Sequence, residues 1–243
     1  MIQGAIANQI ENVLAHIPAE KVGYFRNYFH NVPDEVMDTI RLEKRKPHKV
    51  LVEENDPIDQ IFVLMEGTVK AIDYRVKRAT YEYARFEGVT MLGSMECLFG
   101  IDNYMTTLVT SSPCTFLTMP RQSYESWIWK DTNALQAETK NMRGYLLDRT
   151  RENRVMLLLN GTERLIYILV KICDGKKKSD AYTLTINRQE LAEQSGSSVK
   201  TVNRSIKKLE DQDLLVRDGH KVKITQRQHG MMKEYLEQIS NIS

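Results

Sequence analysis

The spacing of apolar residues along the chain first predicts helices. Over residues 1–42, apolar positions recur at helical intervals in the stretches 6–17 and 22–29. The run Pro33-Asp34-Glu35 is typical of a helix start and leads into residues 36–42. We therefore expect the first 42 residues to be helical.

From Lys49 onward the pattern changes to short runs of β-branched and aromatic residues. Turn residues such as Asn55, Pro57, Gly67 and Gly88 separate these runs. Many short strands at close spacing favour a sandwich or barrel over alternating strands and helices. The expected strands are residues 50–52, 61–64, 69–72, 81–86, 106–110 and 115–119.

A long helix is predicted for residues 132–159, which contain one glycine, Gly144, and no proline. At 1.5 Å per residue this helix would be about 40 Å long. Its apolar residues recur at three-, four- and seven-residue intervals, so the stripe either packs on its own domain or pairs with a second copy. The pattern alone leaves both alternatives open. Asn160-Gly161 ends the helix and is the predicted hinge.

Composition fits a soluble protein with an anionic partner. The 243 residues are 42% hydrophobic and 27% charged, without a secretory signal or an apolar run long enough to span a membrane. Three distant cysteines form no disulfide framework or CxxC pair, so the cytoplasm is the expected location. Residues 175–227 hold 12 Lys and Arg against 7 Asp and Glu, which indicates an anionic polymer as partner.

The order of elements after the hinge predicts a winged helix-turn-helix. A helix over 162–173 and a strand over 182–186 precede two helices joined by a tight turn. A hairpin over 214–225 then turns at Asp218-Gly219. Gly196 fits the positive φ of the turn between the helices, and Ser197 or Ser198 can cap the second one.

The second helix has a core face and a polar outer face. Val202, Ile206 and Leu209 share the core face at i, i+4 and i+7. On the other side, Arg204 can pair with guanine, Asn203 with adenine and Lys207 with phosphate. The segment thus predicts binding to double-stranded DNA. The candidate DNA-binding residues are Ser198, Val199, Lys200, Thr201, Asn203, Arg204 and Lys207.

The segment from Arg188 to Leu215, RQELAEQSGSSVKTVNRSIKKLEDQDLL, closely resembles the helix-turn-helix of the catabolite activator/fumarate–nitrate regulator (CRP/FNR) superfamily. The likeness is looser in residues 49–67, which resemble the first β-roll strands, and in 92–99, which resemble the loop and helix that bind a cyclic-nucleotide phosphate. Residues 132–159 resemble the dimerising helix, which favours pairing with a second copy.

The resemblance implies an α+β fold and a transcription regulator. An N-terminal cyclic-nucleotide-binding-like β-roll (1–130) would be followed by a dimerisation helix and hinge (131–160) and a C-terminal winged helix-turn-helix (161–243). A homodimer on a pseudo-palindromic operator and contact with RNA polymerase are also implied.

Departures from the family pattern bear on both ligands. Cyclic-AMP-responsive members open the recognition helix with an Arg-Glu pair, whereas Val199 and Lys200 stand here, so we expect a different operator. The phosphate-binding arginine falls on Tyr104 or Met105, neither of which neutralises a phosphate. We therefore expect a small effector that is not cAMP. The expected effector pocket consists of Gly93, Ser94, Glu96, Thr106, Thr107, Arg149 and Thr150.

Other cofactors and an enzymatic role are not expected. The oxygen-sensing members hold an iron–sulfur cluster with cysteines near the N-terminus, whereas the first cysteine here is Cys97. Single scattered histidines do not favour haem, and residues 49–120 lack the histidines of a metal-dependent oxygenase. Two alternatives to an effector-controlled regulator stay open: a cyclic-nucleotide-responsive regulator, and a constitutive DNA binder whose β-roll serves only dimerisation.

Overall fold

Two separate clusters of buried apolar side chains divide the chain into two units. The first unit comprises Met1–Asp73 and Tyr83–Leu147, and the second Tyr74–Glu82 and Asp148–Ser243. The computed structural model describes residues 5–76, 79–185, 187–219 and 221–240.

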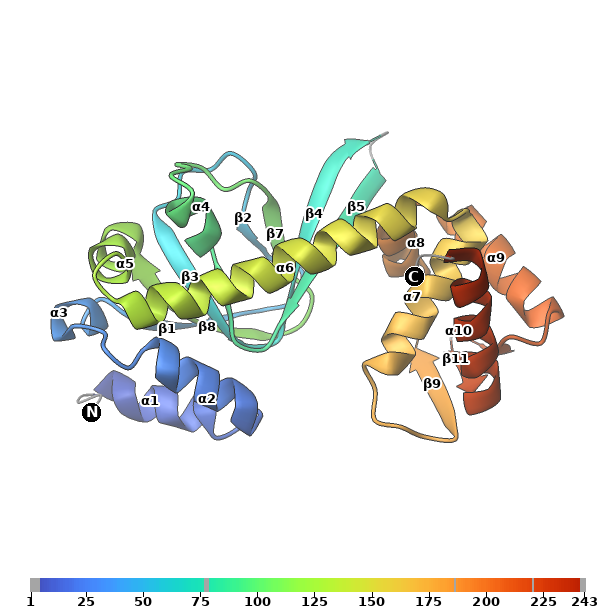
Figure 1. The fold of residues 1–243 in the computed structure, drawn as a ribbon, viewed down its shortest axis with the longest axis horizontal. Coiled ribbons are helices and arrows are strands. Elements are labelled where there is room, and N and C mark those ends of the chain that lie inside the picture. Colours follow the sequence, from blue (N-terminus) through green and yellow to red (C-terminus); the bar gives the residue numbers. More distant parts are fainter. Residues whose placement is uncertain (1–4, 77–78, 186, 220, 241–243) are drawn as a thin grey trace. The chain divides into compact units, whose positions relative to one another are not determined.

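The first unit contains two antiparallel four-stranded sheets, as expected for a β-roll (Figure 1). Strand β3 lies inside the first sheet, and five of its seven residues are buried, which explains its continuous apolar run. The first sheet has the order β1 (Arg41–Arg45), β8 (Cys114–Pro120), β3 (Gln60–Glu66), β6 (Thr90–Leu92). The second has the order β2 (Val50–Val52), β7 (Thr107–Thr110), β4 (Thr68–Val76), β5 (Ala79–Glu87), of which residues 74–76 and 79–82 belong to the second unit.

Gly67 makes the turn between β3 and β4. Its φ is +96°, and an added Cβ would lie 2.4 Å from the carbonyl oxygen of Pro113. Only glycine fits a turn that combines this conformation with such a close approach of the backbone.

The helical prediction for residues 36–42 is wrong beyond the first turn. Helix α3 spans only Asp34–Met37, and Arg41–Arg45 forms the edge strand β1. This strand pairs with β8 in register, Leu42 opposite Leu117. Its sequence, RLEKR, has one apolar residue and no apolar helical face, so pairing with the sheet decides its conformation. Strand β6 was not predicted either, because three residues are too few for a periodic signal.

Helices cover the β-roll and bring aromatic rings together. They are α1 (Ala5–Leu14), α2 (Ala19–Tyr28), α4 (Ser94–Leu98), α5 (Arg121–Ile128) and the first part of α6. Trp127 of α5 lies edge-on to Tyr28 of α2, with ring centroids 5.5 Å apart, and edge-on to Tyr124 at 6.1 Å. These contacts fasten the N-terminal helices to the roll.

The long helix is confirmed: α6 spans Thr132–Leu158. Asp131 fixes its start, because the carboxylate accepts from the backbone N–H groups of Asn133 and Ala134 and from Nε1 of Trp127. No helix in the described ranges has the length and apolar character needed to cross a membrane.

The second unit is a winged helix-turn-helix, with an added C-terminal helix that the sequence did not predict. Its three-stranded antiparallel sheet has the order β10 (Val216–Asp218), β11 (Lys221–Thr225), β9 (Ala181–Thr185). The hairpin turns at Gly219, where φ is +58°, as predicted. Its helices are α7 (Gly161–Asp174), α8 (Arg188–Ser195), α9 (Val199–Asp211) and α10 (Gln226–Ser240). Ile186, predicted in β9, lies outside the described residues.

Candidate nucleic-acid interface and effector site

The turn between α8 and α9 has the predicted geometry. Gly196 ends α8 in the left-handed region, with φ of +60°. The Ser198 hydroxyl caps α9 by accepting from the backbone N–H of Thr201 at 3.1 Å. Both features are encoded locally, by one glycine and one serine at fixed spacing.

One face of α9 is buried, which fixes the orientation of the other. Val202, Ile206 and Leu209 are buried among apolar residues of α7, α8 and the sheet. Ser205 is also buried, and its hydroxyl lies 3.1 Å from that of Thr162 in the first turn of α7. The sequence did not indicate this polar contact, because serine is common on exposed faces.

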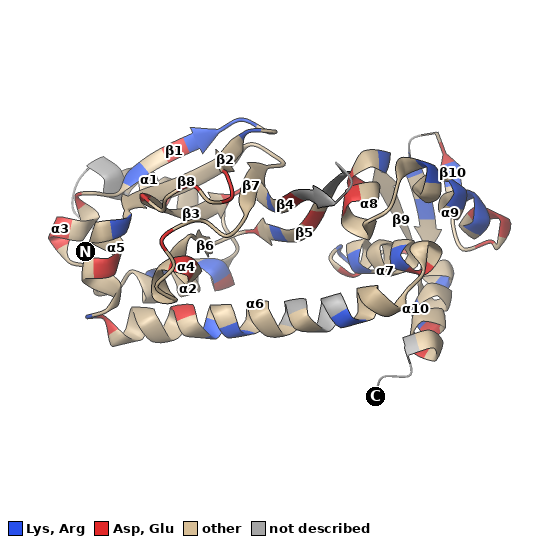
Figure 2. Cartoon of the chain, turned by 90° about the horizontal axis from the view of Figure 1, so that it is seen from above, with Lys and Arg blue, Asp and Glu red and all other residues tan. Residues whose placement is uncertain are grey.

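Five of the seven predicted DNA-contacting residues are exposed at the cap and on the outer face of α9. Lys and Arg are spread along this helix and β11 (Figure 2). Val199 and Thr201 are half-buried. Thr201 turns towards α7, since a Cβ on Gly161 would lie 3.2 Å from its methyl carbon. The exposed members are Ser198, Lys200, Asn203, Arg204 and Lys207.

Two further arginines lie next to this helix and were missed in the sequence. Arg188 begins α8, its Nη1 is buried without a hydrogen-bond partner, and burial together with Arg217 lowers its pKa. Arg217 of β10 forms an ion pair with Glu210 of α9, which ties the wing to that helix. A cation in the first turn of a helix opposes the helix dipole. The position of Arg188 at the start of α8 was therefore the sequence signal that could have indicated a functional role.

Side-chain hydrogen bonds order the junction between α6 and α7. Asn160 caps α7 by accepting from the N–H groups of Thr162 and Glu163, while Glu163 accepts from the N–H of Asn160, a complete capping box. Nε of Arg164 donates to the carbonyl oxygens of Met156 at 2.9 Å and Leu159 at 3.0 Å. The predicted break at Asn160-Gly161 is confirmed. These side chains bond the N–H groups at the start of α7 and the carbonyl groups at the end of α6.

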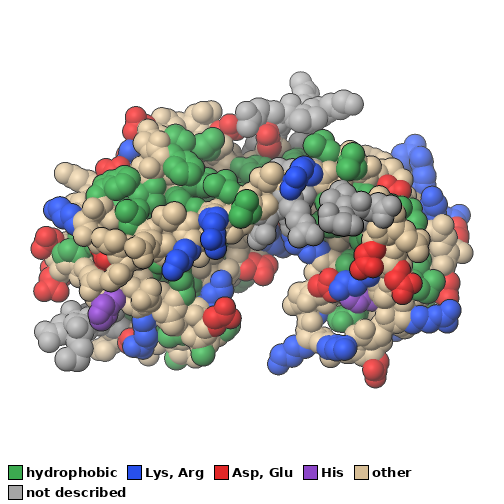
Figure 3. Space-filling model, viewed as in Figure 1, with side chains coloured by type: hydrophobic (Ala, Val, Ile, Leu, Met, Phe, Trp, Pro, Cys, Tyr) green, Lys and Arg blue, Asp and Glu red, His purple; other side chains and the backbone are tan. Residues whose placement is uncertain are grey.

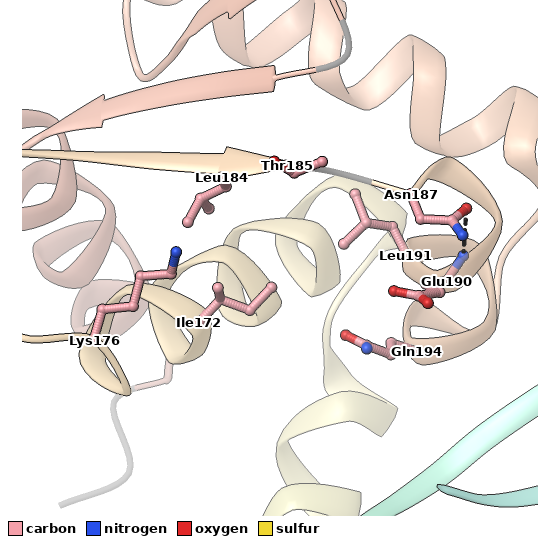
Figure 4. A pocket seen from close by; sticks show the side chains of 8 residues that line it. All are labelled: Ile172, Lys176, Leu184, Thr185, Asn187, Glu190, Leu191 and Gln194. Atoms are coloured by element: carbon pink, nitrogen blue, oxygen red, sulfur yellow. Dashed lines mark hydrogen bonds between the residues drawn. The ribbon is translucent and has the colours of Figure 1, made fainter. Parts of the chain in front are cut away.

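A shallow hollow of about 220 Å³ lies elsewhere in the second unit (Figure 4). The end of α7, β9 and α8 line it, and none of the exposed α9 residues does. Asn187 at its rim is already engaged, because its side chain accepts from the N–H of Glu190. The hollow therefore lies apart from the candidate nucleic-acid interface.

In the first unit, two of the predicted effector residues, Ser94 and Thr107, are bonded to protein groups, whereas the buried Oγ1 of Thr106 has no hydrogen-bond partner among the described residues. Gly93 precedes α4 with φ of +86°. The buried Ser94 hydroxyl donates to Oε1 of Glu138 on α6 at 2.5 Å, a pairing that the sequence did not indicate. Thr107 accepts from the backbone N–H of Glu54 at 3.1 Å.

Tyr83 lies close to two residues of the predicted pocket. It lies beside Thr106 and near Glu96, which is buried on α4. Burial raises the pKa of Tyr83 to about 12, against the influence of the adjacent Thr106 hydroxyl. Thr150 is exposed and belongs to the second unit, so its place in the pocket stays a prediction; the Arg149 side chain lies outside the described part of the chain.

Neither position expected to replace the phosphate-binding arginine carries a cation. Tyr104 is buried, and its hydroxyl donates to the carbonyl oxygen of Gln60. The Met105 side chain is 55% exposed. The ionisable groups on α4 and α6 here are instead the carboxyls of Glu96 and Glu138.

The cysteines and metal-ligating residues do not form a site in the described part of the chain. Cys97, Cys114 and Cys173 are buried and unpaired, and burial raises the pKa of Cys97 and of Cys173 to about 11. Such thiols are poor nucleophiles at neutral pH. No group of three His, Cys, Asp or Glu side chains in the described ranges is arranged to hold a metal ion.

Comparison with known proteins assigns both units. Residues 42–131 match the cyclic nucleotide-binding domain, and residues 163–229 match the Crp-like helix-turn-helix domain. The chain belongs to the CRP/FNR superfamily of transcription regulators. No curated protein sequence matches it significantly.

Solved structures of CRP/FNR regulators share this fold. The c-di-GMP-responsive global regulator CLP of Xanthomonas campestris is 19% identical, with a TM-score of 0.70 over 86% of this chain and 99% of CLP. A CRP/FNR-family regulator of Thermus thermophilus is 15% identical, with a TM-score of 0.67 over 81% and 98% of the two chains. FixK2 of Bradyrhizobium japonicum is 16% identical, with a TM-score of 0.60 over 79% and 96%.

Proposed function

We propose that this CRP/FNR regulator binds a pseudo-palindromic DNA site as a homodimer through α9. The observation that carries the proposal is the exposed polar face of α9, whose opposite face is held in the core. A helix with donors in its first turns suits the major groove. Arg204 is assigned to guanine, Asn203 to adenine, and Lys207 with Arg188 to phosphates.

Exposed leucines on α6 support the homodimer. Leu157 and Leu158 are 79% and 76% exposed, and Leu146 and Leu147 are exposed as well. Apolar side chains also gather on the face of the first unit drawn in Figure 3. A long helix with exposed leucines suits pairing with a second copy, which removes them from water.

The proposed effector is a small molecule other than cAMP. A phosphate placed at α4 would meet two carboxyl groups and no arginine at either expected position. Ser94, which could otherwise donate to an anion, already donates to Glu138. Burying an anion without a cation costs several kcal/mol, so a ligand without phosphate fits these residues better. Because the first cysteine is Cys97 and the histidines are scattered singly, we also expect neither an iron–sulfur cluster nor haem.

Random-site selection with the full chain tests the DNA proposal. We expect one enriched two-fold-symmetric sequence and an affinity that falls steeply with salt. Sedimentation should give a dimer, and the double substitution Leu157→Glu, Leu158→Glu should shift it towards monomer. A monomeric protein without salt-sensitive affinity for any duplex would contradict the proposal.

Calorimetry tests the effector proposal, with cAMP and with c-di-GMP, to which CLP responds. Micromolar binding of cAMP would favour the cyclic-nucleotide-responsive alternative. Operator affinity measured aerobically, anaerobically and with candidate metabolites separates a sensor from a constitutive DNA binder. Transcription in vitro with RNA polymerase then gives the sign of regulation.

A further inference from the structure

Glu138 is a carboxyl group buried inside the first unit. Only 3% of this α6 residue is exposed. Oε1 accepts a hydrogen bond from the Ser94 hydroxyl of α4. The second oxygen, Oε2, is buried and has no hydrogen-bond partner among the described residues. An unpartnered buried oxygen costs less in a neutral acid than in a carboxylate.

The groups that face Glu138 from the neighbouring helices are hydroxyls. They are Ser94 of α4, Tyr24 and Tyr28 of α2, and Tyr124 of α5. The Tyr28 and Tyr124 hydroxyls lie 3.1 Å apart, and burial raises the pKa of both tyrosines far above the neutral range. These four groups are neutral near pH 7, so they do not compensate a charge on Glu138.

Burial has the larger effect on the carboxyl group. It raises the pKa of Glu138 to about 7, and the nearby hydroxyls of Ser94 and Tyr28 oppose this rise only in part. The proton on this group is therefore lost within the range of pH that cells experience.

We propose that Glu138 is a proton-controlled contact between α4, in the candidate effector site, and the long helix α6. The neutral acid remains packed against Ser94 and the three tyrosines. Loss of the proton leaves a buried charge, and hydrating that charge requires α6 to separate from α4 and α2. The regulatory part of this inference, control of DNA affinity, rests on the proposed function.

Trp127 offers a direct readout, because its ring contacts those of Tyr28 and Tyr124. The chain has two tryptophans, and Trp129 is exposed, so Trp129→Phe leaves Trp127 as the sole reporter. In this background we expect Trp127 emission to change with a midpoint near pH 7. Glu138→Gln should abolish that change and keep the low-pH emission. Glu53→Gln, which alters an exposed carboxyl of the same unit, should retain it.

A second variant keeps the test decisive if Glu138→Gln does not fold. Ser94→Ala removes a hydrogen bond that favours the charged form, so the midpoint should move to higher pH. Histidines also titrate near pH 7, so the comparison with Glu138→Gln is what assigns the change in emission to Glu138. A midpoint that is unchanged in Glu138→Gln, or an emission that does not change with pH in the parent, would overturn the proposal.

Binding to the selected duplex at pH 6 and pH 8 tests the regulatory part. We expect a severalfold change in parent affinity and a smaller one in Glu138→Gln. Equal changes in both would overturn control of DNA affinity by Glu138. Failure of the parent to bind any selected duplex would overturn the proposed function, and the Trp127 titration would still decide whether Glu138 is a proton-controlled contact.

Discussion

Helices α4 and α9 both follow a glycine with positive φ, yet they present their polar residues in opposite directions. In α9, the polar side chains at the start of the helix face water while its apolar stripe is buried. In α4, Ser94 and Glu96 are buried, and Ser94 is bonded to Glu138. The exposed face of α9 thus stays open to an outside partner, whereas Ser94 of the predicted effector site is engaged inside the protein.

Removing the buried face of α9 should have the largest effect. Leu209→Ala deletes a fully buried side chain and should cost about 2–4 kcal/mol of unfolding free energy. The matched substitution Lys208→Ala, on the exposed side, should cost about 0.5 kcal/mol or less. Chemical denaturation measures both, and equal losses would contradict the assignment of the two faces.

The next largest effect is the pH dependence of stability that the buried carboxyl of Glu138 causes. The pKa of Glu138 is raised in the folded state, so the stability it contributes is complete below about pH 4.5 and is lost as pH rises through about 7. Glu138→Gln should therefore stabilise the protein by about 2–3 kcal/mol at pH 8, with little effect at pH 5. Denaturation at both pH values checks this, and a larger gain at pH 5 would reverse the assignment.

The exposed face of α9 should affect DNA binding and leave stability nearly unchanged. Arg204→Ala should cost about 1–3 kcal/mol of binding free energy and relax one base position. Lys207→Ala should weaken all sequences similarly and reduce the salt slope by about 1. Lys130→Ala, an exposed substitution in the first unit, serves as control. Equal loss of discrimination from both α9 variants would contradict their separate roles.

Ser198, the cap of α9, is expected to affect both stability and DNA binding, and its substitution should give the smallest effect. Ser198→Ala removes the hydrogen bond to Thr201 N–H and should cost about 1 kcal/mol of stability. Ser198→Asp should restore the cap while repelling phosphate. If the aspartate variant bound DNA as well as the parent, Ser198 would not lie near the DNA backbone.

The helix-turn-helix could be predicted from the sequence because its determinants are local. Gly196, Ser198 and the spacing of Val202, Ile206 and Leu209 lie within 14 residues, and each acts through backbone conformation or helical periodicity. The pairing of Ser94 with Glu138 joins polar residues 44 positions apart, which no periodic pattern encodes.

The edge strand β1 could not be predicted from the sequence either, because it depends on distant residues. Its conformation depends on pairing with β8, about 70 residues later, whereas its own composition of Arg, Leu, Glu and Lys favours a helix.

Arg164 has a consequence for dividing the protein into fragments. The capping box suggests Asn160 as the first residue of an isolated DNA-binding module. A fragment that began there would remove the carbonyl groups of Met156 and Leu159 and leave the Arg164 Nε donor without either acceptor. Designers who transplant this module onto another sensor should therefore make the fusion upstream of Met156 and retain the last turn of α6.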